Sequence, residues 1–172
     1  MHAMKSYTYL DQAPLLEVDV HEGLENTLVI MQHKLKPGVA VSREYSPDLP
    51  RIEAYASELN QVWTNIIHNA IDAMNGKGQL TLRTHSEDDQ VIVEITDNGP
   101  GIPADQHRLL FEKFQQLDVS GGRRPGTGLG LHFCKLAVEA HGGKISVESN
   151  PSQGSTFVIQ LPVGSPESCP DA

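Results

Sequence analysis

The segment from Ser57 to Met74 is the feature that most constrains the fold. Its apolar side chains recur at helical spacing and cover most of a helix circumference: Leu59, Val62, Trp63, Ile66, Ile67, Ala70, Ile71 and Met74. Ser57 is the expected N-cap, and the Gly-containing stretch at 75–78 is the expected end. The pattern predicts a long helix that packs on an apolar layer.

The same helix carries a polar arc about 100° wide. Its members are Glu58, Gln61, Asn65, His68, Asn69 and Asp72. The arc contains no Lys or Arg, although a solvated face usually carries long charges. Its two Asn residues, one turn apart, offer neutral amide oxygens that suit a hard cation bound to phosphate. The alternative is an ordinary amphipathic helix with its polar face in water.

The remaining segments predict a mixed α/β architecture. Strands are expected at 14–20 (short), 39–45, 51–55, 79–85, 90–97, 144–149 and 155–162, and helices at 22–35, 104–114 (short) and 128–141. This order predicts an α/β (α+β) two-layer sandwich, a single sheet with helices packed on one face.

Three further motifs follow the long helix. Asp97-Asn98-Gly99-Pro100-Gly101 ends an apolar strand, where a carboxylate can accept a hydrogen bond from an exocyclic amine such as that of adenine. Gly126-Thr127-Gly128-Leu129-Gly130-Leu131 enters a helix and could bind an anion through backbone N–H groups. Gly154-Ser155-Thr156-Phe157 begins the last strand. Taken singly, each motif is also compatible with an ordinary turn or a flexible loop.

Charge and composition narrow the classes of partner. The 172 residues carry a formal charge of −9, and no Lys/Arg cluster favours binding to nucleic acid or to a membrane surface. An acidic chain that binds polyphosphate needs a cation, which favours Mg²⁺. Cys134 and Cys169 lack metal-site spacing and are interpreted as free thiols of a reducing compartment. We therefore expect a cytoplasmic domain that makes no membrane contact of its own, although the parent protein could be membrane-attached.

Together the four segments resemble, in sequence order, the motifs of the ATPase superfamily that unites gyrase, the large heat-shock chaperone, mismatch-repair ATPases and histidine kinases. The resemblance covers about residues 18–162 and is greatest to sensor histidine kinases. The stretch Asn60–Ala70 is similar to the kinase N box, and Leu110–Phe114 is similar to the F box. His141-Gly142-Gly143-Lys144-Ile145 resembles the usual kinase ending.

The resemblance implies a Bergerat fold that binds ATP between the long helix and a lid at about 115–126. It implies that Asn69 binds Mg²⁺, that Asn65 lies beside the phosphates, and that Asp97 accepts a hydrogen bond from the adenine amine. Gly99, Gly101 and Thr156 would support Asp97, and the segment Gly126, Thr127, Gly128, Leu129 and Gly130 would close on the phosphates. Asn65 and Asn69 are the expected catalytic pair.

Two positions separate this chain from its relatives. In hydrolysing members, the position of Asn65 carries a Glu that activates water, and an amide cannot accept that proton. Asn65 therefore favours a kinase. Many histidine kinases have a Lys where this chain has Asp72, so the positive charge must come from elsewhere; Lys113, Arg123 and Arg124 are the expected sources.

The expected activity is transfer of the ATP γ-phosphate to a histidine on a dimerisation domain, for relay to a response-regulator receiver domain. Residues 1–13 are interpreted as a remnant of the dimerisation helix or linker, 14–163 as the ATP-binding domain, and 164–172 as a disordered tail. His21, followed by Glu22, is interpreted as a helix-start residue and not as the phosphoacceptor. The chain alone is therefore expected to bind ATP without completing autophosphorylation. Two alternatives remain, an anti-sigma-type serine kinase and a non-catalytic nucleotide-sensing module.

Overall fold

The computed structural model of the chain describes residues 15–107, 109–112, 118–119, 122–123, 130–149 and 154–164. Its main layer is a five-stranded mixed sheet with the strand order β2 (Val39–Glu44), β4 (Gly78–Glu87), β5 (Gln90–Asp97), β9 (Ser155–Pro162) and β8 (Lys144–Ser149). β2 pairs with β4 in parallel, and the other neighbours are antiparallel. Two small antiparallel pairs accompany it: β1 (Leu16–Val18) with β3 (Ile52–Ala54), and β6 (Asp118–Val119) with β7 (Gly122–Arg123).

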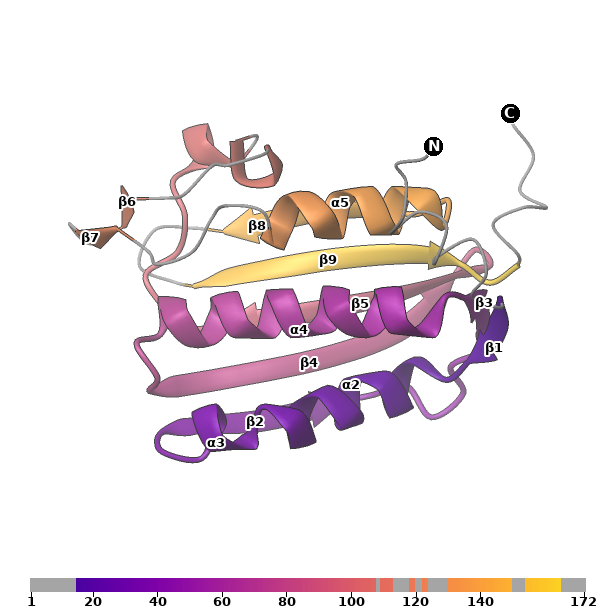
Figure 1. The fold of residues 1–172 in the computed structure, drawn as a ribbon, viewed down its shortest axis with the longest axis horizontal. Helices are drawn as coiled ribbons and strands as arrows, with labels where there is room; N and C mark the ends of the chain where they lie inside the picture. The colour runs from indigo at the N-terminus through magenta and orange to yellow at the C-terminus, as the bar shows by residue number, and fades with distance from the viewer. Residues whose placement is uncertain are drawn as a thin grey trace, which may run out of the picture.

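Three helices lie side by side against one face of this sheet (Figure 1): α2 (Val20–Ile30), α4 (Ala56–Ala73) and α5 (Gly130–Ala140). α4 is the central helix, with α2 on one side and α5 on the other. A single helical turn, α3 (Gln32–Leu35), follows α2. This arrangement confirms the predicted two-layer α/β sandwich with helices on one face.

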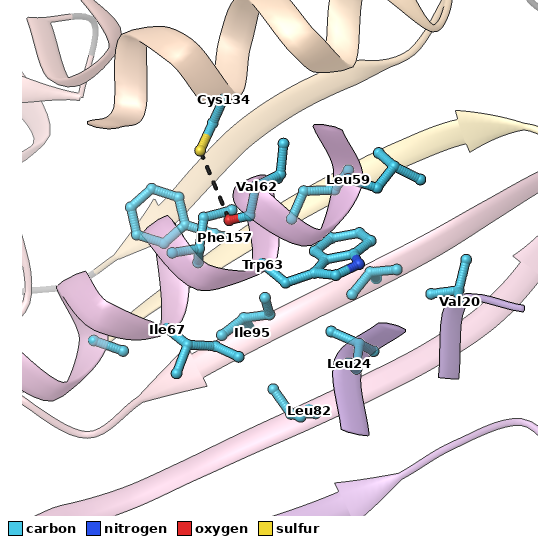
Figure 2. Close-up of a cluster of buried hydrophobic side chains, with 14 of the residues drawn as sticks. Val20, Leu24, Leu59, Val62, Trp63, Ile67, Leu82, Ile95, Cys134 and Phe157 are labelled. Carbon is cyan, nitrogen blue, oxygen red and sulfur yellow. Dashed lines mark hydrogen bonds between the residues drawn. The ribbon is translucent and has the colours of Figure 1, made fainter. Parts of the chain in front are cut away.

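The apolar stripe of α4 explains its central place. Trp63 is buried between α2 and the sheet, close to Leu24 and Val20 (Figure 2). On the other side of α4, the Cys134 thiol of α5 lies 3.8 Å from the Val62 carbonyl oxygen (Figure 2). Burial raises the pKa of the Cys134 thiol to about 12, so this free cysteine stays protonated and acts as a small apolar side chain.

Several predicted boundaries were wrong. The helix expected at 22–35 begins at Val20, capped by the Asp19 carboxylate, and is interrupted at Met31 (φ −97°, ψ 11°). Ser57 is not the N-cap of α4, because the helix begins at Ala56 and Tyr55 occupies the cap position without a side-chain cap bond. In the stretch expected to be helical at 104–114, the described residues form two short 3₁₀ turns, η1 (Ala104–Gln106) and η2 (Leu109–Phe111).

His21 lies in the first turn of α2, as the sequence interpretation held. Its ring stacks on Tyr45 with centroids 4.3 Å apart, and its Nε2 lies 2.7 Å from the Thr84 hydroxyl of β4. The imidazole is therefore engaged inside the domain. In the part of the chain that the structure describes, no helix is long and apolar enough to cross a membrane.

Candidate nucleotide site

A pocket opens between the C-terminal half of α4, the end of β5 and the start of α5. Two of its lining residues are polar side chains predicted for the site, Asn69 and Asp97. The other lining residues are Ala73, Pro100, Gly101, Ile102, Leu110, Leu131, Ser155 and Phe157. The pocket therefore combines an apolar wall with a carboxylate and an amide, the composition expected of a small-molecule site.

Asp97 sits at the last position of β5, where the loop 98–103 begins. Its side chain is buried (3% exposed), and its Oδ1 accepts a hydrogen bond from the Gly99 N–H at 2.8 Å. A buried carboxylate beside apolar walls is costly unless hydrogen-bonded groups compensate it. The arrangement can recognise the amine of a flat, otherwise apolar ring, because such a ring both contacts the walls and donates to the carboxylate.

Glycines allow the backbone to approach Asp97 closely. A Cβ at Gly99 would come within 2.9 Å of the Ala73 carbonyl oxygen. Gly154 adopts a φ of +89°, and a Cβ there would collide with the Asp97 carbonyl oxygen. Both positions therefore require glycine to hold the end of β5 against α4 and β9.

Asn65 and Asn69 lie one turn apart on α4 and face the α5 side of the helix. Asn69 lines the pocket. Asn65 donates from Nδ2 to the Gly130 carbonyl oxygen at 3.1 Å, and its Oδ1 accepts from Gln61 Nε2 at 2.9 Å. The polar stripe thus reaches Gly130, the first residue of α5, and the N-terminal end of a helix favours an anion.

The structure separates Thr156 from the other predicted site residues. Thr156 pairs with Thr96 across the sheet, and their hydroxyls lie 2.9 Å apart, whereas Asp97 pairs with Ser155. Because successive side chains of a strand point to opposite faces, Thr156 points away from the pocket and Ser155 lines it. The prediction was off by one residue: Ser155 takes the position that had been expected for Thr156.

Sequence reasoning missed a serine that supports the pocket from β8. The Ser149 hydroxyl accepts from the Ile102 N–H at 2.7 Å and donates to the Gly154 carbonyl oxygen at 3.0 Å. It therefore joins the loop after β5 to Gly154, which directly precedes β9. Nothing in the local sequence around Ser149 marks this role, which depends on strand pairing. The apolar wall residues Leu110 and Leu131 were detectable, because both lie in the predicted F-box and glycine-rich segments.

The donor set can be tested against Mg²⁺. Within the residues that the structure describes, no group of three or more His, Cys, Asp or Glu side chains could hold a metal ion. Mg²⁺ is commonly bound by one or two protein oxygens together with substrate phosphates. The amide of Asn69 beside an anion-favouring helix terminus fits an ion that arrives with a phosphate.

Part of the predicted site lies outside the described residues. This applies to Lys113, Arg124 and the segment Gly126–Leu129. Arg123 belongs to β7, where the structure describes the backbone and not the side chain. The predicted segment 1–13 and all but the first residue of the predicted tail at 164–172 also lie outside, so the proposed domain limits stay predictions.

Residues 54–165 match the protein family described as histidine kinase-, DNA gyrase B- and HSP90-like ATPase. The chain belongs to this family. Within the family it is similar to the alginate biosynthesis sensor protein KinB of Pseudomonas aeruginosa, with 37% identity over 125 residues, covering 73% of this chain and 20% of KinB. It is also similar to the sensory histidine kinase/phosphatase NtrB of Vibrio alginolyticus, with 34% identity over 157 residues, covering 84% of this chain and 43% of NtrB.

Solved structures of this ATPase family agree with these relatives. The catalytic domain of histidine kinase ThkA superposes with a TM-score of 0.78 at 28% identity, covering 90% of this chain and 98% of that domain. ThkA in complex with the response regulator protein TrrA gives a TM-score of 0.74 at 26% identity, covering 90% of this chain and 43% of ThkA. The chain is therefore an ATP-binding catalytic domain of the sensor histidine kinase type, as the sequence predicted, and it spans less than half the length of the curated relatives it matches.

Proposed function

We propose that this domain binds Mg·ATP in the pocket between α4, β5 and α5, and transfers the γ-phosphate to a histidine on a dimerisation domain. The observation that carries the proposal is that Asn69 and Asp97, which lie 28 positions apart in the sequence, line one pocket. Membership of the ATPase family and the similarity to histidine kinases support ATP as the nucleotide.

The pocket gives the nucleotide a direction. The adenine ring would lie against Ile102 and Phe157 and donate its amine hydrogen to Asp97. The phosphates would then point along α4 toward Asn69 and the first turn of α5, where backbone N–H groups stabilise negative charge. Ser155, beside Asp97, would complete the polar end of the adenine site.

Asn69 would hold Mg²⁺ through its amide oxygen, and the bound ion would neutralise developing charge on the phosphates. Asn65 cannot act as a general base, and its amide is held by Gly130 and Gln61. Slow hydrolysis preserves the γ-phosphate for the acceptor histidine. Positioning and charge stabilisation then supply most of the catalysis.

The partners follow from the reaction. The domain needs a phosphoacceptor domain, and the phosphate would pass to a response-regulator receiver domain; the complex of ThkA with TrrA supports such a partner. We place the domain in the cytoplasm, where ATP and receiver domains are present.

Two measurements test the proposal in sequence. Calorimetry should show binding of Mg·ATP, and no binding would overturn the proposed function. The domain mixed with the dimerisation domain of its parent kinase and γ-labelled ATP should then produce an acid-labile, base-stable phosphate, which is typical of phosphohistidine. An acid-stable phosphate would indicate a serine kinase, and binding without transfer to any acceptor would indicate a nucleotide-sensing module.

A further inference from the structure

The polar stripe of α4 carries an unfavourable charge for a triphosphate. Asp72 is a neighbour of both Asn69 and His68 on the helix surface, because residues three or four apart lie side by side. Its carboxylate would repel phosphates that lie beside Asn69. A cation near Asp72 would remove that repulsion and attract the phosphates.

The structure brings a cation to this stripe from another element. Lys34 of α3 has its Nζ 3.2 Å from the Nε2 of His68, and the His68 Nδ1 lies 3.5 Å from the Asp72 Oδ2. Because a lysine ammonium can only donate, His68 accepts at Nε2 and carries its proton on Nδ1, toward Asp72. His68 thus connects the lysine charge to the carboxylate.

The interruption at Met31 explains how Lys34 reaches α4. Met31 and Leu35 are both buried, 4% and 6% exposed, so the single turn of α3 is anchored at both ends. Lys34 precedes the buried Leu35, and its side chain extends from α3 to His68 on α4. A continuous helix through Met31 would place Lys34 at a different position around the helix axis. The interruption at Met31 therefore allows the contact between Lys34 and His68.

We propose that Lys34, positioned by His68, supplies part of the positive charge that holds the nucleotide phosphates and stands in for a lysine at the Asp72 position. The inference rests on the proposed nucleotide site and assigns an electrostatic role to a residue outside the recognised motifs. Lys34 does not line the pocket, so it would act on the phosphates through its charge and not by contact, and its effect depends on the number of phosphates.

Lys34→Gln tests this directly, and Lys36→Gln is the matched control. Lys36 lies two residues further along, is exposed, and gives the same change in net charge. By calorimetry, Lys34→Gln should weaken Mg·ATP binding about three- to fivefold, the upper range expected for one exposed charge, while Lys36→Gln should change it by less than about 1.5-fold. The loss should be smaller for ADP and absent for adenosine, and it should shrink as salt rises.

Two more variants separate binding from packing. Lys34→Arg should keep near wild-type affinity, and His68→Leu should lose part of it by releasing Lys34. Thermal unfolding of each variant shows whether the fold is retained. Equal affinities for Lys34→Gln and Lys36→Gln, or an equal loss for adenosine and ATP, would overturn the role of Lys34. Failure of the wild-type domain to bind any nucleotide would instead overturn the proposed function itself.

Discussion

The two ends of the α4–α5 pair differ in their surroundings: one lies beside the pocket and the other lies in the core. The helices run antiparallel, so the start of α5 meets the middle of α4 at Asn65 and Gly130, and the end of α5 meets the start of α4 at His141 and Tyr55. Both junctions consist of a side chain bonded to the backbone of the other helix. One borders the pocket, and the other closes the core.

The closed junction satisfies both ring nitrogens of its histidine. His141 is 1% exposed; its Nδ1–H donates to the Ala137 carbonyl oxygen at 2.7 Å, and its Nε2 accepts from the Tyr55 N–H at 3.1 Å. A carbonyl only accepts and an amide N–H only donates, so the partners fix a neutral tautomer. The open junction, between Asn65 and Gly130, instead lies beside the pocket.

We infer that stability depends more on the closed end, at His141 and Tyr55, and that nucleotide binding depends more on the open end, at Asn65 and Gly130.

The largest expected effect is a loss of nucleotide affinity from a substitution at the open end alone. Asp97→Asn keeps an oxygen for the Gly99 N–H but presents an NH₂ group to the adenine amine, so donor would meet donor. Mg·ATP affinity should fall by about 100-fold or more, because a buried polar group left unpaired costs about 1–3 kcal/mol and a favourable bond is also lost. Calorimetry measures the loss, and thermal unfolding should show a nearly unchanged domain. Unchanged affinity would refute the role assigned to Asp97.

The second effect is a loss of stability from a substitution at the closed end alone. His141→Leu leaves the Tyr55 N–H without its acceptor and should lower the free energy of unfolding by about 2 kcal/mol. His141→Gln, whose amide oxygen can accept that bond, should cost less. Denaturant unfolding provides the measurement. The folded fraction should bind Mg·ATP with near wild-type affinity; a loss of binding as large as that of Asp97→Asn would remove the distinction between the two ends.

Sequence reasoning succeeded where a pattern was long and local. The 18-residue helix α4 and the alternating strands β4, β5 and β9 all form where expected. Placement of Asn69 and Asp97 in one pocket also followed the prediction, although their roles toward nucleotide and metal stay predictions.

Sequence reasoning failed where distant contacts decide local structure. Ser57 has the ideal chemistry for an N-cap, yet the Tyr55 N–H bonds to His141, 86 residues away, and the helix begins before Ser57. Met31 interrupts a helix without a Gly or Pro, because its own burial and that of Leu35 fix α3 in place. Ser149 and Lys34 act across strands and helices. No short sequence window contains both partners of such contacts.

The third effect lies at the open end and concerns the metal. Asn69→Ala removes an amide oxygen from the pocket without touching the Asn65–Gly130 bond. We expect roughly tenfold weaker ATP binding in the presence of Mg²⁺ and little change in its absence, since the lost ligand acts through the ion. Calorimetry with Mg²⁺ and with a chelator gives both values. An equal loss under both conditions would mean that Asn69 contacts the nucleotide directly.

The smallest effect tests the closed end by pH. Glu58, in the first turn of α4, is half-buried, and desolvation raises its pKa. The positive end of α4 would favour the charged form, so the two influences compete. Because desolvation is the larger influence, the contribution of Glu58 to stability is full below its unfolded pKa, near 4.5, and declines as the pH rises through the higher folded value. The difference in unfolding free energy between wild type and Glu58→Gln should therefore fall by a few tenths of a kcal/mol between about pH 4 and pH 7, because the carboxyl is still partly solvated.

Denaturant unfolding across this range measures the slope. A difference that rises with pH would show that the helix terminus, and not burial, governs the charge state at this end of α4.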